Sequence, residues 1–129
     1  MLRSGTVLSI VFIALGCSST RSLPPIPPAD EIRVRGLTEE TSRVDDPDRI
    51  RQVTSIANQY REGWDIPWYG PPVARTNLIF YADGAAVADL GIGDTFLTRT
   101  ADNFYSRTVD SADLEKIRGI LNVENPYTK

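Results

Sequence analysis

Few side chains in this 129-residue sequence could carry out catalysis, because it contains no histidine and Cys17 is its only cysteine. A Ser-His-Asp or Cys-His site is therefore excluded, and so are zinc sites built on His or Cys. Carboxylate catalysis would need two acids that face each other across a cleft. The nearest candidates are Asp83, Asp89 and Asp94, but two fall in predicted turns and Asp89 fits the wet face of a strand. We therefore expect no enzyme, no cofactor and no metal site.

The first candidate binding surface is an aromatic loop at residues 64–72. Trp68 and Tyr69 are flanked there by prolines, so they would form a stiff platform that loses little entropy on binding. Arg75 follows the loop and could pair with Asp65 or with an anionic ligand. The alternative is that the tryptophans cover one end of the core while the prolines fix the chain crossing.

The second candidate binding surface combines tyrosine with arginine near the end of the chain. Tyr105 and Arg107 lie on one predicted strand, and Thr98 and Arg99 lie on the strand before it. We expect these side chains to decorate the open face of the last strands. Such a surface could bind a glycan or a partner strand, or it could be an ordinary solvated face.

Cys17 stands at the end of a short apolar run. Arg3 and the amino terminus form a positive region, residues 7–15 are largely apolar, and small Gly16 directly precedes the cysteine. This order is the layout of an export signal. A membrane-spanning helix needs about 20 apolar residues, and this run has about half as many.

Residues 14–17, Ala-Leu-Gly-Cys, resemble the lipobox of bacterial lipoproteins, with the leucine and the small residue in reversed order. The resemblance implies that residues 1–16 are a signal peptide and that lipidated Cys17 becomes the first mature residue, attached to the membrane. Ser18 follows where lipoproteins held in the inner membrane commonly have Asp. In a Gram-negative host this implies the outer membrane, on its periplasmic side. A plain cleaved signal peptide and an intact anchor are the alternatives.

Composition indicates one modest domain with a slight acidic excess. The chain has 17 acidic and 14 basic residues, for a net charge of −3, which argues against nucleic acid as a partner. Residues 17–30 contain four prolines within five positions. We expect them to form the lipidated cysteine and an extended tether of up to about 40 Å. Residues 31–129 would form the single domain.

Apolar periodicity predicts five strands in that domain. Residues 31–36 alternate apolar Ile32 and Val34 with charged neighbours, which is typical of a strand with one wet face. Residues 37–44 are polar and are expected to form a loop. The other strands are expected at residues 77–82, 86–90, 95–99 and 104–109.

Capping signals predict two helices. Asp46 is expected to cap the first, whose apolar stripe continues to Trp64 and which Gly63 would end in a left-handed conformation. Asp110 or Ser111 would cap a final helix that ends near Asn122.

The clearest turn signal is Asp83–Gly84, which is typical of a two-residue hairpin. This turn would place Ala82 opposite Ala85 and Phe80 opposite Val87. Because strand side chains alternate between two faces, a slip of one residue would exchange buried and exposed positions.

The resulting order is β-α-β-β-β-β-α, and the expected fold class is α+β: a two-layer sandwich with an antiparallel sheet. The whole chain resembles small Gram-negative envelope lipoproteins in architecture. We expect a lipid-anchored periplasmic interaction or assembly module whose partner is an envelope protein or a glycan. The alternatives are an inhibitor or adaptor that presents the aromatic loop, and a carboxylate-dependent envelope hydrolase.

Overall fold

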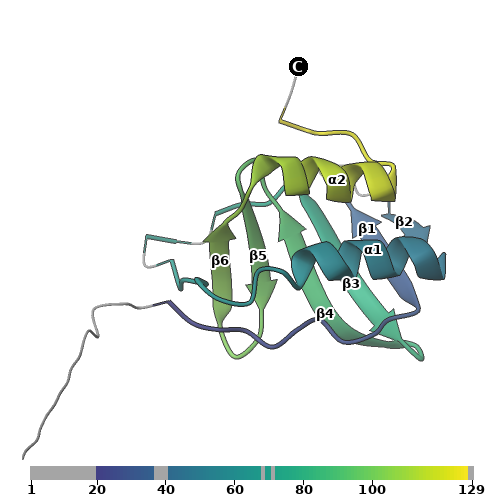
Figure 1. Ribbon diagram of the computed structural model, residues 1–129, viewed down its shortest axis with the longest axis horizontal. Coiled ribbons are helices and arrows are strands. Elements are labelled where there is room, and N and C mark those ends of the chain that lie inside the picture. The colour runs from purple at the N-terminus through teal and green to yellow at the C-terminus, as the bar shows by residue number, and fades with distance from the viewer. Residues whose placement is uncertain (1–19, 37–40, 68, 71, 128–129) are drawn as a thin grey trace, which may run out of the picture.

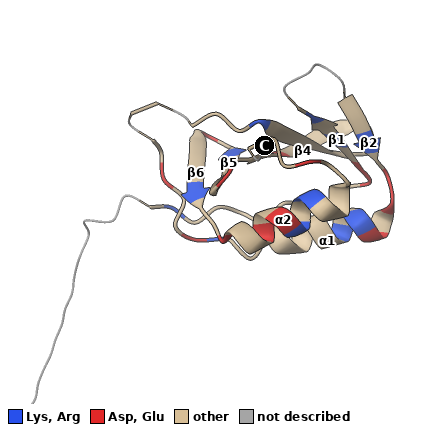
Figure 2. Cartoon of the chain, turned by 90° about the horizontal axis from the view of Figure 1, so that it is seen from above, with Lys and Arg blue, Asp and Glu red and all other residues tan. Residues whose placement is uncertain are grey.

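The computed structural model describes residues 20–36, 41–67, 69–70 and 72–127. Two helices, side by side, cover one face of a six-stranded antiparallel sheet (Figures 1 and 2). The strand order in the sheet is β2-β1-β3-β4-β5-β6. In chain order the elements are β1 (Glu31–Arg35), β2 (Thr41–Val44), α1 (Pro47–Ala57), β3 (Thr76–Ala82), β4 (Ala85–Ile92), β5 (Phe96–Thr100), β6 (Phe104–Thr108) and α2 (Ser111–Leu121).

The α+β class, the antiparallel sheet and the order of the predicted elements are confirmed. The structure adds β2, in the segment where a loop was expected. This strand pairs with β1, with Val44 opposite Ile32 and Thr41 opposite Arg35. Its pattern is polar because it is an outer strand and only Val44 is buried in the core, so hydrophobic alternation could not reveal it.

Both helices begin at the predicted caps. The Asp46 carboxylate accepts a hydrogen bond from the Asp48 N–H at 2.9 Å, and Asp110 accepts one from the Ala112 N–H at 3.0 Å. Helix α1, however, ends at Ala57 rather than at Gly63. Residues 58–60 still bond back to the last turn of the helix, and the backbone groups of Arg61 and Trp64 then bond to the N-terminal segment.

The Asp83–Gly84 turn forms as predicted, with positive φ angles of 52° and 82°. Ala82 lies opposite Ala85, also as predicted. The register then shifts between Tyr81 and Phe80, so Phe80 lies opposite Ala88 rather than Val87. Local turn chemistry therefore determined the hairpin, but not the pairing beyond its first residues.

The core lies between the helices and the inner face of the sheet. Most of its side chains are aliphatic, and the aromatic side chains of Phe80 and Trp64 are among its largest. The sheet contributes Ile32, Val34, Val44, Leu78, Leu90, Ile92 and Leu97, and the helices contribute Ile50, Val53, Leu114 and Ile117. No helix in the described part of the chain is long and apolar enough to cross a membrane.

Residues 21–30, here called the strap, pack against the domain. Leu23 and Ile26 are only 4% and 3% exposed. The Leu23 N–H donates to the Arg61 carbonyl at 2.8 Å, and the Asn58 side chain bonds both backbone groups of Ile26. Residues 21–30 of the expected extended tether therefore contact the domain through two buried side chains and these hydrogen bonds. Burying each of these aliphatic side chains stabilises by about 1.5–3 kcal/mol, which holds the proline-rich chain in place.

Candidate functional site

Of the predicted site residues that the structure describes, Tyr69 and Arg107 line one hollow, and Arg75 and Tyr105 lie elsewhere. Cys17 and Trp68 lie outside the described residues. Tyr69 lies on the aromatic loop and is exposed, and it lines a hollow of about 450 Å³ between the loop, the start of β5 and the end of β6. Trp64 is instead completely buried, and its indole N–H donates to the Tyr60 carbonyl at 2.7 Å. The alternative interpretation, in which a tryptophan covers the core, therefore holds for Trp64.

Arg75 contacts the C-terminal tail rather than Asp65. Its backbone N–H donates to the Tyr127 hydroxyl at 2.9 Å, and its guanidinium lies 5.3 Å from the centre of the Tyr127 ring. Its side chain also reaches the Pro126 carbonyl at 3.4 Å. These contacts indicate a structural role for Arg75, which connects the segment before β3 to the end of the chain.

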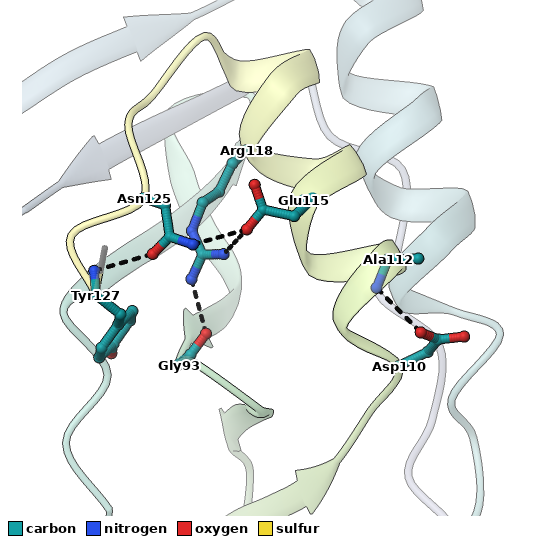
Figure 3. A network of polar contacts seen from close by, with 7 residues as sticks. All are labelled: Gly93, Asp110, Ala112, Glu115, Arg118, Asn125 and Tyr127. Atoms are coloured by element: carbon teal, nitrogen blue, oxygen red, sulfur yellow. Dashed lines mark hydrogen bonds and ion pairs between the residues drawn. The ribbon is translucent and has the colours of Figure 1, made fainter. Parts of the chain in front are cut away.

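The C-terminal tail, residues 123–127, also contacts a polar network around Arg118 of α2 (Figure 3). This buried guanidinium donates to the Gly93 carbonyl at 2.7 Å and pairs with Glu115 at 2.8 Å. Asn125 donates to the same Glu115 carboxylate at 2.8 Å. The Tyr127 ring lies 5.7 Å from the Arg118 guanidinium, so this network holds α2, the β4–β5 turn and the tail together.

The structure corrects the expected Tyr–Arg surface on the last strands. Tyr105 is 2% exposed, and it lies opposite Arg99 on the face that carries the buried Leu97. Its hydroxyl donates to Asp102 at 2.7 Å. That hydrogen bond, helped by burial, raises the pKa of Tyr105. Tyr105 therefore belongs to the core and not to an open face.

Arg107 also lies on the inner face, where it is partly exposed and lines the hollow beside Tyr69. It donates to the Glu62 carbonyl at 2.6 Å and stacks on the Tyr60 ring at 4.7 Å. Arg99, one strand away, donates to the Pro24 carbonyl of the strap at 2.7 Å, and burial lowers the pKa of Arg99. Both guanidinium groups thus satisfy backbone carbonyls at the β6 end of the molecule.

A surface of the predicted chemistry lies instead on the open face of β1, β2 and β3. It is a groove of about 530 Å³, here called the arginine groove, and it carries three arginines with a single acid. This charge is opposite in sign to the net charge of the chain. The lining residues are Glu31, Arg33, Arg35, Thr41, Arg43, Asn77, Ile79 and Tyr81.

Two of these arginines share one carboxylate. Glu31 pairs with the Nε of Arg33 at 2.7 Å and with the Nε of Arg43 at 3.4 Å. The hydrogen bond to Glu31 raises the pKa of Arg33, and the guanidinium stacks 4.2 Å from the centre of the Tyr81 ring. Arg35 is exposed beside them. Guanidinium groups bind carboxylate and phosphate through paired N–H donors, so this arrangement is suited to an anionic ligand.

The sequence predicted the β1 side of this groove only. The alternation of Glu31, Arg33 and Arg35 was assigned to a wet strand face, and the structure places them there. Arg43 was missed because β2 was expected to be a loop. Only strand pairing brings Arg43 opposite Arg33 and Tyr81 opposite Glu31.

The three candidate catalytic acids lie at separate places in the fold, two in turns and one on a strand. Asp83 occupies the hairpin turn, and Asp94 is exposed between β4 and β5. The two oxygens of Asp89 accept hydrogen bonds from the Thr100 N–H at 2.9 Å and from its hydroxyl at 3.0 Å. Within the described residues, no three His, Cys, Asp or Glu side chains cluster as metal ligands would.

Comparison of the chain with known protein families, with curated proteins and with solved structures found no match.

Proposed function

We propose that this protein is a lipid-anchored envelope module, not an enzyme, that binds an anionic glycan through the arginine groove. The lipid is carried by Cys17, and the domain faces the periplasm from the outer membrane. The observation that supports binding is the outward cluster of Arg33, Arg35 and Arg43 on the open face. The sequence pattern at residues 14–17 supports the anchor.

The uncharged lining suits a sugar chain. Thr41 and Asn77 can exchange hydrogen bonds with hydroxyl groups, while Ile79 and Tyr81 supply an apolar floor. The arginines would bind carboxylate or phosphate groups on the same ligand. An acidic protein strand is the less favoured partner, because the neighbouring edge strand β2 has only four residues and carries Arg43. Short, charged edges resist strand addition.

Binding can be measured by calorimetry on residues 17–129 with Cys17→Ser, which removes the lipid. Oligogalacturonate provides carboxylates, glucosamine phosphate provides a phosphate, and poly-L-glutamate stands for an acidic protein. We expect a sugar probe to bind, and Arg35→Ala with Arg43→Ala to weaken it about tenfold or more, since a hydrogen bond to a charged group is worth about 1.5–3 kcal/mol.

Arg51→Ala is the matched control, because Arg51 is exposed on α1 outside the groove and pairs with Asp48. An equal loss in this variant would show that binding follows overall charge and would contradict a site in the groove. Preference for poly-L-glutamate over both sugars would replace the glycan with an acidic protein.

The anchor has its own test. Cys17→Ser should abolish labelling with radioactive palmitate and release the protein from the membrane fraction. Mass spectrometry of the natural protein should find an acylated amino-terminal Cys17. Continued labelling of the Cys17→Ser variant, or a mature chain with an unmodified amino terminus, would contradict the lipidation.

A further inference from the structure

We propose that the aromatic loop is a second membrane contact, which rests the β6 end of the domain on the phospholipid headgroups. The contact is made by Ile66 and Tyr69 of the loop and by Val73, which directly follows it. The inference rests on the proposed lipid anchor at Cys17. It goes further by assigning an orientation to the domain and a lipid surface to the loop.

The strap limits how far the domain can stand from the lipid. The Arg21 N–H donates to the Trp64 carbonyl at 2.7 Å, and the Trp64 N–H donates back at 3.1 Å. Leu23 follows and is buried. The chain is therefore fixed to the domain from Arg21 onward. Only four residue steps separate Cys17 from Arg21, and a fully extended chain spans at most about 3.6 Å per residue, or about 14 Å.

The fixed point lies at the same end of the molecule as the aromatic loop. The strap enters beside β6, and the loop projects from that end in both views (Figures 1 and 2). Backbone hydrogen bonds connect the three segments. Arg21 bonds to Trp64, and the next residue, Asp65, exchanges two bonds of 2.9 Å with Ser106 of β6. A lipid on Cys17 therefore holds this end of the domain next to the bilayer.

The loop exposes apolar surface at this end. Among the described residues four large hydrophobic side chains are exposed: Ile66 at 39%, Tyr69 at 69%, Val73 at 77% and Val87 at 38%. Three of them fall within eight consecutive residues, 66–73, whereas Val87 lies near the start of β4, beside the Asp83–Gly84 turn. Aromatic and aliphatic side chains of this kind are favoured where the headgroups meet the acyl chains.

The test uses the lipidated full-length protein with one added cysteine, either Tyr69→Cys or Val87→Cys, in phosphatidylethanolamine–phosphatidylglycerol vesicles. The sulfur of Cys17 is blocked by its thioether, so a nitrobenzoxadiazole label attaches only to the new thiol. We expect iodide to quench the label at position 69 about threefold less than the label at position 87, because headgroup burial of about 5–10 Å excludes the aqueous quencher.

Flotation of the same samples separates the two possible failures. If the protein floats with the vesicles and iodide quenches both labels equally, the loop does not touch the membrane and the inference is wrong while the anchor stands. If the protein does not float, the lipid anchor has failed and the second contact fails with it. Weak quenching at both positions would also contradict an orientation that places only the β6 end on the lipid.

Discussion

Arginines at the two edges of the sheet have opposite environments. Near the β6 edge, Arg99 and Arg107 lie on the inner face and donate to carbonyls of the strap and of the α1–β3 connection. Near the β2 edge, Arg33 and Arg43 lie on the open face and share Glu31. The same residue type therefore fastens the fold at one edge and forms a candidate binding surface at the other. Successive side chains of a strand point to opposite faces of the sheet, so the position of each arginine along its strand decides which face it occupies.

The edges themselves also differ. The β6 edge is covered, because Asp65 pairs with Ser106 through two backbone hydrogen bonds. The β2 edge is the outer strand at the other side. With strands about 4.8 Å apart, five spacings put β2 about 24 Å from β6. In the proposed orientation the arginine groove would stand away from the lipid.

The largest expected effect concerns the β6 end of the molecule, where the edge of the sheet is covered. Trp64→Ala should lower the free energy of unfolding by about 3–5 kcal/mol, because it removes a fully buried indole that also donates to the Tyr60 carbonyl. Urea unfolding monitored by circular dichroism measures it. Tyr69→Ala is the control on the same loop and should change stability by less than about 0.5 kcal/mol. Similar losses in both variants would mean that the loop, and not Trp64, supports this end.

The second test distinguishes a strap from a tether. Ile26→Ala should cost about 2–4 kcal/mol, because Ile26 is buried and its neighbours can relax only partly around the cavity. Pro25 is exposed in the same segment, so Pro25→Ala should have an effect several times smaller in the same urea experiment. A negligible change for Ile26→Ala would show that the strap does not pack as described.

The third test compares the two kinds of arginine directly. Arg99→Ala should lower the free energy of unfolding by about 1–3 kcal/mol, since it leaves the Pro24 carbonyl without its donor. Arg35→Ala should change it by less than about 0.5 kcal/mol, as is usual for an exposed site. Chemical denaturation of the two variants side by side gives the comparison. The reverse ranking would mean that β1 or β5 has its faces exchanged.

The smallest effect is a pH dependence at the inner face. The folded state raises the pKa of Tyr105 above its usual value of about 10, so the folded chain holds the phenolic proton more tightly. This contribution to stability is complete below about pH 10 and is lost as the pH rises through the raised pKa. Denaturation from pH 8 to pH 11 should show a decline that is shallower in Tyr105→Phe. Burial and Asp113 also raise the pKa of Tyr60, so Tyr60 should contribute to the slope in both proteins. A slope unchanged by Tyr105→Phe would contradict this account of Tyr105.

Features controlled by neighbouring residues could be predicted from the sequence alone. The caps at Asp46 and Asp110, the turn at Asp83–Gly84 and the wet face of β1 all form as their local chemistry indicates. A capping carboxylate reaches an N–H two residues away, and a turn of positive φ selects Asp and Gly. These contacts span a few residues, so sequence patterns identify them reliably.

The candidate site depended on contacts between distant residues. The predicted Tyr–Arg chemistry exists on an open face, but on β1–β3 rather than β5–β6. The expected pattern for Tyr105 and Arg107 assigned them to the wrong side of the last strands, and one step along a strand exchanges its two faces. The strap was missed for a related reason, because Leu23 and Ile26 sit among prolines without any helical or strand period.

The sequence by itself determined the α+β class, the helix starts, the hairpin turn and the pattern that suggests an export signal. Only the tertiary structure decided which arginines face outward, that residues 41–44 form an edge strand and that the proline-rich segment packs on the core. Those outcomes depend on strand register and on pairing between segments tens of residues apart. The free energy of such contacts comes from the surface they bury together, which the local pattern of either segment does not contain.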